Sequence, residues 1–191
     1  MTLVRTLAPT RPSVEDLRRL YESDGARLRQ AIARIAPTLD ADDLLHETFV
    51  IALQKVHELE QVASPQAWLY GVALKLAATR RRTAKLRRFF GLEDARDLPG
   101  VDAPSRTMAQ RDAQRRVQAA LETLSDAKRE VFVLFELQGL SGDEVAQACG
   151  IPLKTVWTRL FHARKEVTAA IERSVLIEAR TSGLPKDEVM P

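Results

Sequence analysis

His46 and Glu47 come nearest to a catalytic or metal-binding motif in this sequence of 191 residues. They begin the pattern H-E-x-x-H, in which two histidines one helical turn apart bind zinc and the glutamate acts as a general base. Position 50 is Val50, so the second zinc ligand is missing. Asp42, Asp43 and Glu47 favour another role, because carboxylates in the first turn of a helix are stabilised by its dipole. We therefore expect no catalytic residue, no metal site and no cofactor.

A run of basic residues between positions 75 and 88 contains seven cations and no acidic residue. The whole chain has 29 Lys and Arg against 26 Asp and Glu, a net charge of +3, so this segment alone exceeds the total. Like charges at this density repel one another, and a phosphate backbone would neutralise them. A solvated helix face is the alternative interpretation. The cations of the run are Lys75, Arg80, Arg81, Arg82, Lys85, Arg87 and Arg88.

Residues 141–173 have the spacing of a helix-turn-helix motif, in which two helices meet at a short turn. A capping box of the form S-x-x-E, from Ser141 to Glu144, predicts the start of a short helix. Gly150 predicts its end, and Pro152 begins a long second helix. Helix-turn-helix geometry also occurs in domains that bind no DNA, so the pattern alone leaves the partner open.

The second of these helices divides into an apolar stripe and a face that suits DNA. The stripe expected to pack inward consists of Val156, Leu160, Ala163 and Val167. The opposite face mixes cations for phosphates, polar groups for base edges and apolar groups for thymine methyls. Two of its aromatic residues lie one turn apart, and exposed aromatic side chains need a partner, either DNA or protein. This DNA-facing set is Lys154, Thr155, Trp157, Thr158, Arg159, Phe161, His162, Arg164 and Lys165.

A helical period dominates the chain, and no stretch alternates apolar and polar residues for the length of a strand. The period is clear over 14–35, and Asp40 and Ser64 are predicted N-caps of two further helices. We expect an all-α protein. In the helix that follows Asp40, one stripe is expected to be buried: Leu45, Phe49, Ala52, Leu53 and Val56.

A segment rich in glycine, proline and acidic residues divides the chain at 91–104, and it is predicted to be a flexible linker. We therefore expect two small helical domains, at 13–90 and 105–177. Residues 1–12 are expected to form a disordered leader, and 178–191 a polar tail.

Composition excludes several classes of protein. No apolar stretch approaches the ~20 residues that a membrane-spanning helix needs, and the first residues lack the apolar core of a secretory signal. The single cysteine, Cys149, rules out an internal disulfide and any zinc site made of several cysteines, and it fits a reducing cytosol. We expect Cys149 to be a small buried apolar residue.

The first half of the chain resembles region 2 of the extracytoplasmic-function (ECF) sigma factors, a bacterial group within the sigma-70 family. Residues 40–49, D-A-D-D-L-L-H-E-T-F, are similar to the family's acidic helix D-A-x-D-L-x-Q-E-x-F. Residues 65–73, P-Q-A-W-L-Y-G-V-A, are similar to its A-W-L-x-x-I-A segment, and an arginine run follows in both. The second half resembles region 4, with G-L-S at 139–141 and G-I-P at 150–152 in the family's order.

The resemblance implies a fold of two helical domains that bind core RNA polymerase, through its β and β′ subunits, and promoter DNA. Such a protein recognises −35 and −10 promoter elements, directs transcription initiation and is not an enzyme. The implied polymerase contacts are Asp43, Leu44, Leu45, Glu47, Thr48 and Phe49. The implied −10 contacts are Lys75, Arg80, Arg81, Arg82 and Lys85. The implied −35 contacts are the DNA-facing set of the last helix.

The same resemblance implies an anti-sigma factor as a partner that holds the protein inactive until a signal arrives. The expected location is the cytoplasm, on the nucleoid when active and near the membrane when the anti-sigma factor is bound. In the arginine-rich helix the family usually has an Asn and an Asp at the positions that Lys75 and Thr79 hold here. This departure leaves the detailed −10 contacts open. Trp157 replaces a basic residue and leaves the −35 sequence open, and Trp68 is expected to pack inward.

A dimeric helix-turn-helix regulator that is not a sigma factor is the alternative interpretation. It would account equally well for residues 125–173. It would not account for the acidic helix and the arginine run within 40–88. Dimeric regulators bind two half-sites about one helical turn apart, so a palindromic footprint would favour this alternative.

Overall fold

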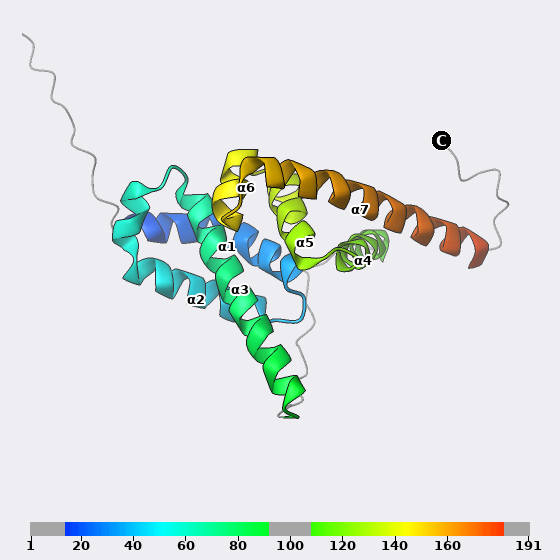
Figure 1. Ribbon diagram of the computed structural model, residues 1–191, viewed down its shortest axis with the longest axis horizontal. Coiled ribbons are helices and arrows are strands. Elements are labelled where there is room, and N and C mark those ends of the chain that lie inside the picture. Colours follow the sequence, from blue (N-terminus) through cyan, green and yellow to red (C-terminus); the bar gives the residue numbers. More distant parts are fainter. Residues whose placement is uncertain (1–13, 92–107, 182–191) are drawn as a thin grey trace, which may run out of the picture.

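The computed structural model describes residues 14–91 and 108–181, and within these residues every regular element is a helix. The expectation of an all-α protein is confirmed (Figure 1). The elements in chain order are α1 (Val14–Ile35), α2 (Ala41–Gln54), the 3₁₀ helix η1 (Val56–Gln61), α3 (Pro65–Phe89), α4 (Met108–Glu122), α5 (Asp126–Phe132), the π-helix η2 (Val133–Leu137), α6 (Gly142–Cys149) and α7 (Leu153–Thr181).

The predicted leader at 1–12 and nearly all of the predicted linker at 91–104 lie outside the described residues. The tail predicted from position 178 is wrong at its start, because α7 continues to Thr181. Helical residues with no Gly or Pro separate Pro152 from this end, so nothing in the local sequence stops the helix earlier.

The helix starts predicted from capping residues are confirmed. The Asp40 side chain accepts hydrogen bonds from the backbone N–H groups of Asp42 and Asp43. Ser64 accepts one from the Ala67 N–H, and Ser141 forms the complete capping box with Glu144. Each side chain satisfies a backbone donor that has no partner within its helix, which fixes where the helix begins.

Helices α1, α2 and α3 pack together as the first domain. Leu28 and Ile32 of α1, Leu44 of α2 and Leu69 of α3 are buried in its core. The first half of α3 is embedded in this core, whereas its second half, from about position 79, extends away from it as a basic arm (Figure 1). Because the same helix is apolar at one end and cationic at the other, the core fixes the direction in which the cations project.

Helices α4 to α7 form the second domain, in which α7 packs on α4, α5 and α6. Its inward stripe is buried as predicted, with Val156 and Ala163 fully covered. Buried Arg129 of α5 donates hydrogen bonds to the carbonyl oxygens of Leu121 and Leu124, at 2.8 and 2.9 Å. This guanidinium therefore fastens the end of α4 to α5 at a turn where helix carbonyls lack partners.

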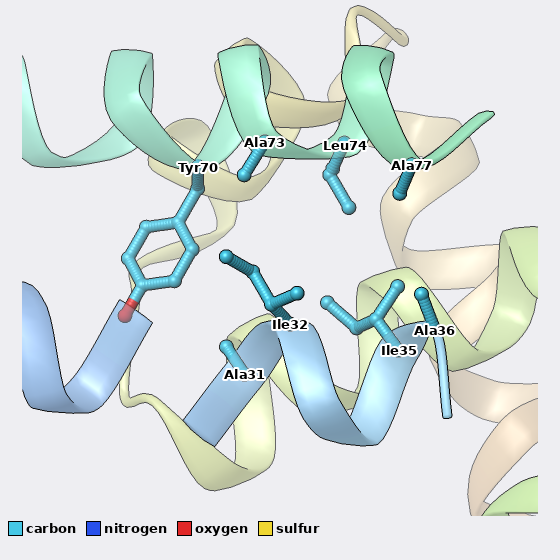
Figure 2. Close-up of a pocket in the computed structure, with 8 residues that line it drawn as sticks. All are labelled: Ala31, Ile32, Ile35, Ala36, Tyr70, Ala73, Leu74 and Ala77. Carbon is cyan, nitrogen blue, oxygen red and sulfur yellow. The ribbon is translucent and has the colours of Figure 1, made fainter. Parts of the chain in front are cut away.

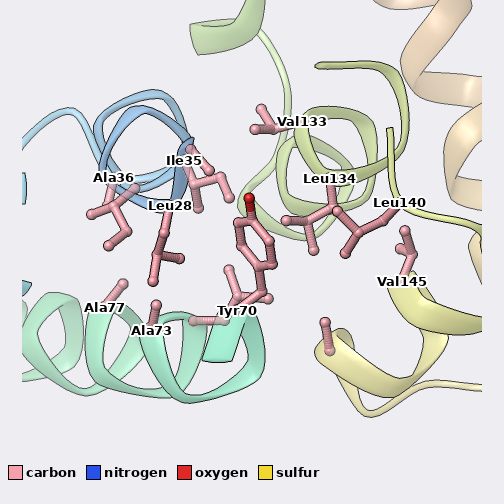
Figure 3. Close-up of a cluster of buried hydrophobic side chains, with 14 of the residues drawn as sticks. Leu28, Ile35, Ala36, Tyr70, Ala73, Ala77, Val133, Leu134, Leu140 and Val145 are labelled. Carbon is pink, nitrogen blue, oxygen red and sulfur yellow. The ribbon is translucent and has the colours of Figure 1, made fainter. Parts of the chain in front are cut away.

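The two domains are in direct contact, so they share more than a linker. Helix α6 packs on α3, and α1 contacts α5 and η2. One cluster of buried apolar side chains runs through both domains, and Figure 3 shows Tyr70 of α3 between Leu28 of α1 and Leu134 of η2. The Tyr70 side chain is buried, and loss of hydration raises its pKa to about 12.

A small apolar cavity lies between α1 and α3 within the first domain (Figure 2). Ile32, Ile35, Leu74 and Ala77 line it, together with Tyr70 at one end. The lining offers no carboxylate, imidazole or amine, so the cavity is a packing gap rather than a binding site for a polar ligand.

Candidate nucleic-acid interface

The recognition face of α7 is the DNA-facing set predicted from the sequence, and the structure places it on the solvent side of the helix. Lys154, Thr158, His162 and Lys165 are exposed, and Arg159 is half-buried. Because the buried stripe holds the opposite side of α7 in the core, these side chains project together along three turns of one rigid helix. An α-helix with such a face fits the major groove of DNA.

Trp157 and Phe161 are both partly exposed, at 45% and 55%, as the sequence predicted for two aromatic residues of this face. Trp157 also packs edge-on against Phe135 of η2, with ring centroids 5.5 Å apart. Its ring covers Gly142 at the start of α6, where an added Cβ would lie 2.6 Å from Trp157 Cζ2. Trp157 therefore serves two purposes, since one edge fixes α7 to α6 and the other faces solvent.

Two cations of the recognition face are held by neighbours. The Arg164 guanidinium donates to the Glu136 carboxylate at 2.6 Å and lies over the Phe135 ring. The Lys165 ammonium lies 4.6 Å from the centroid of the Phe161 ring. Such contacts restrict long side chains without removing their charge, so the face presents positive potential in a defined geometry.

The basic face of α3 is organised differently, because carboxylates hold its central arginines. Arg80 donates to the Glu47 carboxylate at 2.6 Å and lies 3.7 Å from Asp43, both in α2. Arg81 donates to Glu130 of α5 at 2.9 Å and lies 3.5 Å from Asp126. Two cations of the predicted −10 set are thus paired within the chain.

The remaining cations of the −10 set are exposed. Lys75, Arg82 and Lys85 project from α3 and form no ion pair with any residue in the described ranges 14–91 and 108–181. These three residues are spaced along about 15 Å of α3. They are therefore directly accessible to a phosphate backbone.

Helix α2 carries the predicted polymerase contacts, and the structure divides them into two groups. Asp43 and Glu47 lie on the outer face, next to Arg80. The other four, by contrast, are buried in the core of the first domain: Leu44, Leu45, Thr48 and Phe49. In this conformation these four are not accessible to a partner, which corrects the expectation that they form a docking surface. The reason is that the apolar stripe of α2 is needed to hold α1 and α3 together.

Leu53 corrects a second expectation on α2, because it is 47% exposed rather than part of the buried stripe. Val50, one turn before it, is 51% exposed. Together with Glu47 they give the outer face of α2 an apolar patch beside an acidic one. This patch was not predicted from the sequence, although Val50 and Leu53 are three residues apart and lie off the line of Leu45 and Phe49.

The C-terminal end of α3 holds another apolar group that was not predicted from the sequence. Leu86, Phe89 and Phe90 are exposed, Phe89 by 82%, and the two phenyl rings meet edge-to-face at 5.4 Å. These side chains follow immediately after the exposed cations, so an apolar surface adjoins a basic one.

The structure offers little for other kinds of chemistry within its described residues. No group of three His, Cys, Asp or Glu side chains is arranged to hold a metal ion in that part of the chain. No helix there is long and apolar enough to cross a membrane. Cys149 is half-buried rather than fully buried as expected, and loss of hydration raises the pKa of its thiol to about 12, so it is not a reactive thiolate.

Comparisons with known proteins match both domains. Residues 20–87 match the family described as Sigma-70 region 2, and residues 114–167 match the family described as Sigma-70, region 4. The chain is 30% identical over 160 residues to the RNA polymerase sigma factor NccH of Alcaligenes xylosoxydans, an alignment that covers 81% of this chain and 86% of NccH.

Two solved structures are similar in fold. CnrH in complex with the cytosolic domain of CnrY has a TM-score of 0.60 and 26% identity, covering 84% of this chain and 90% of CnrH. The sigma factor RpoE in complex with the anti-sigma factor NepR, from Bartonella quintana, has a TM-score of 0.66 and 21% identity. That alignment covers 83% of this chain and 98% of RpoE.

Proposed function

Because the chain belongs to the ECF group of the sigma-70 family of RNA polymerase sigma factors, we propose that three of its helices have separate roles in promoter recognition. Helix α7 reads the −35 element, the basic arm of α3 contacts the −10 region, and the outer face of α2 docks on core polymerase. The protein contributes binding, and the polymerase carries out RNA synthesis.

One observation carries this proposal above the others: seven of the nine residues of the DNA-facing set of α7 are exposed, and the other two, Thr155 and Arg159, are half-buried beside the stripe. Base contacts fall to Trp157, Thr158, Phe161 and His162, because their groups can meet base edges and thymine methyls in the major groove. Phosphate contacts fall to the cations at either end of the face and to Thr155. These cations are Lys154, Arg159, Arg164 and Lys165.

The −10 contacts begin with Lys75, Arg82 and Lys85, which are free of ion pairs within the described residues. Arg80 and Arg81 join them once their carboxylate partners are displaced. Strand separation exposes single-stranded DNA, and a row of cations that follows the backbone suits that substrate.

The polymerase contacts lie on α2, where Asp43 and Glu47 provide negative charge and Val50 and Leu53 provide apolar area. An apolar patch beside acidic groups suits a partner surface that is itself apolar and basic. The four buried residues of α2 support this face from behind rather than touching the partner.

We further assign the two domains to 13–90 and 105–177 and place the protein in the cytoplasm, where polymerase and promoters are. A structural relative, RpoE, has been solved with an anti-sigma factor. An anti-sigma factor is therefore the proposed regulatory partner of this chain, bound near the membrane until the inducing signal releases the protein.

A reconstituted transcription assay tests the proposal. Core polymerase, this protein and a library of promoter fragments should together give transcripts from a subset of fragments, whereas core polymerase alone should give none. His162→Ala should shift which fragments are transcribed, while Glu172→Gln, an exposed change farther along α7, should not. Absence of transcripts together with a palindromic footprint of the protein alone would overturn the sigma assignment in favour of the dimeric regulator.

A further inference from the structure

The wide turn of the π-helix η2 brings two consecutive side chains to α7. Its hydrogen bond from the Gln138 N–H to the Val133 carbonyl oxygen, at 3.0 Å, joins residues five apart, whereas an α-helix joins residues four apart. Adjacent side chains of an α-helix face different directions. Here Phe135 and Glu136 both contact α7. Single π-turns of this kind are frequent at functional sites.

Phe135 lies between two residues of the recognition face. The Trp157 ring packs edge-on against it, with centroids 5.5 Å apart, and the Arg164 guanidinium carbon lies 5.7 Å from its centroid. Both distances are within the range of favourable aromatic and cation–π contacts. Trp157 and Arg164 are two helical turns apart, about 10.5 Å along α7. One half-buried phenyl ring of η2 therefore contacts a proposed base contact and a proposed phosphate contact together.

Orientation matters more for Trp157 than for a flexible cation. A lysine adjusts its long side chain to a phosphate, whereas an indole has a fixed shape and only two rotatable bonds. The base that Trp157 can contact therefore depends on the direction of its ring. Gly142 of α6 closes off one side, since an added Cβ there would lie 2.6 Å from Trp157 Cζ2, and Phe135 closes off another. These two contacts form a clamp on the indole.

Glu136 holds Arg164 from a second direction. Arg164 Nε donates to Glu136 Oε1 at 2.6 Å, and the two side chains are 55% and 30% exposed. A guanidinium that bonds to a carboxylate has fewer donors left for a DNA phosphate, and the carboxylate itself repels phosphate. Phe135 and Glu136 thus have opposite consequences, because the ring aligns the cation with Trp157 and the carboxylate competes with DNA for it.

Phe135 and Glu136 lie on η2 and are outside the DNA-facing set of α7. We propose that they are positioning residues for −35 recognition. Phe135 couples the base contact of Trp157 to the phosphate contact of Arg164, and Glu136 limits the strength of that phosphate contact. The inference rests on the proposed function for its effect on promoters, whereas the ordering of Trp157 by Phe135 can be measured without DNA.

Fluorescence of Trp157 tests the clamp in the free protein. The chain has two tryptophans, so Trp68→Phe leaves Trp157 as the single emitter. In this background Phe135→Leu should increase acrylamide quenching and lower the emission anisotropy, whereas Phe135→Tyr, which keeps a ring, should change neither. Phe132→Leu, a half-buried position one turn earlier, is the matched control. Equal quenching in Phe135→Leu and in its parent would overturn the clamp.

A double-mutant cycle tests the coupling in the complex of the full chain with core polymerase. The effects of Trp157→Ala and Arg164→Ala on promoter affinity should depart from additivity by about threefold or more, because one ring orders both residues. In the Phe135→Leu background the two effects should become additive, and discrimination at one −35 base position should fall about tenfold. Phe135→Tyr should preserve both the coupling and the discrimination. Additivity in the unmodified chain, or coupling that survives Phe135→Leu, would overturn the role of Phe135.

The salt dependence of the same complex tests Glu136. Glu136→Gln should tighten binding to all −35 sequences about equally and steepen the slope of log K against log salt by up to about one, because Arg164 becomes available to a phosphate. Glu172→Gln removes an equal charge at an exposed position farther along α7 and is the control. Unchanged or weaker binding in Glu136→Gln would contradict the role of this carboxylate.

The results separate failure of this inference from failure of the proposed function. If the complex shows no preference among −35 sequences while Phe135→Leu still frees the Trp157 ring, the clamp stands and the proposed function has failed. If the preference is present but Phe135→Leu changes neither that preference nor the fluorescence, the positioning role has failed and the proposed function stands.

Discussion

Helices α3 and α7 both carry cations that we propose contact DNA, but the two sets of cations have different surroundings. On α7 the apolar stripe is buried, and the charged groups point to solvent, restrained by rings and one glutamate. On α3 the central pair, Arg80 and Arg81, is bound by four carboxylates from α2 and α5. The recognition face of α7 is already in place for binding, whereas Arg80 and Arg81 of α3 must first release their carboxylate partners.

The difference shows how a near-neutral chain carries two strongly basic surfaces. Acidic residues that would otherwise weaken DNA binding lie opposite the α3 arginines and neutralise them while no DNA is present. The exposed pairs of Arg80 with Asp43 and Glu47 contribute only about 0–1 kcal/mol each, so a phosphate can replace these carboxylates at small cost. The Arg81–Glu130 pair is mostly buried and therefore costs more to break. The recognition face of α7 needs no such exchange, because its shape is fixed by the core behind it.

The largest effect is expected at Arg129, which holds the framework shared by both faces. Arg129→Ala should lower the free energy of unfolding by about 3 kcal/mol, because the carbonyl oxygens of Leu121 and Leu124 lose a buried donor. Thermal and urea unfolding of the variant measure this loss. Arg82→Ala, at an exposed position on α3, is the matched control and should change stability by less than about 0.5 kcal/mol; equal losses would mean that Arg129 is not a structural residue.

A smaller effect is expected where α7 meets α6. Gly142→Ala should cost about 1–3 kcal/mol of stability, because the new methyl group lies within 3 Å of the Trp157 ring and forces it to move. The same change should weaken binding to −35 DNA, since the ring also belongs to the recognition face. Urea unfolding and DNA titration provide the two measurements.

The control is the Trp157→Ala background, in which the ring is absent and Gly142→Ala should cost little. A double-mutant cycle gives the coupling directly. Independent, additive effects of the two changes would contradict the assignment of Trp157 as the contact that orders α7.

The fold was predictable from the sequence where local rules decide it. Asp40, Ser64 and Ser141 are capping residues whose geometry depends on neighbours in the chain, and each marks a helix start as expected. The buried stripe of α7 was predictable too, because a single helix with one apolar side has one way to face a core.

The interface and the division of α2 were not predictable in the same way. Leu44 and Leu45 are apolar residues that would suit either a docking surface or a buried core. Only the positions of α1 and α3 decide which of the two they form. The ion pair of Arg81 with Glu130 joins residues 49 positions apart, and the contact of Gly71 with Ala148 joins two domains. Such contacts depend on tertiary packing, which no local pattern in one sequence specifies.

The two kinds of contact on α7 can be separated by their dependence on sequence and on salt. His162→Ala should cost about 1–3 kcal/mol on the preferred promoter and reduce discrimination at one base position, because a base contact is lost. Lys154→Ala should weaken binding to all promoters about equally and reduce the slope of log K against log salt by about one. Binding titrations over a promoter set at several salt concentrations measure both. Unchanged discrimination in His162→Ala would show that another part of α7 faces the groove.

The smallest effect concerns Glu144, which lies where the two domains meet. The Ser141 backbone N–H, the Ser141 hydroxyl and the Ser64 hydroxyl donate to this carboxylate and hold its pKa below the ordinary 4.5. A carboxyl whose pKa is lowered by folding contributes stability above its unfolded pKa, and that contribution is lost as pH falls through the folded pKa. Glu144→Gln should therefore lower stability by about 0.5–1 kcal/mol at pH 7 and by much less near pH 3, as measured by urea unfolding at the two values. Asp143→Asn, at the neighbouring exposed position of α6, is the control. If Glu144→Gln lowered stability equally at the two pH values, the negative charge of Glu144 would not be the source of the stabilisation.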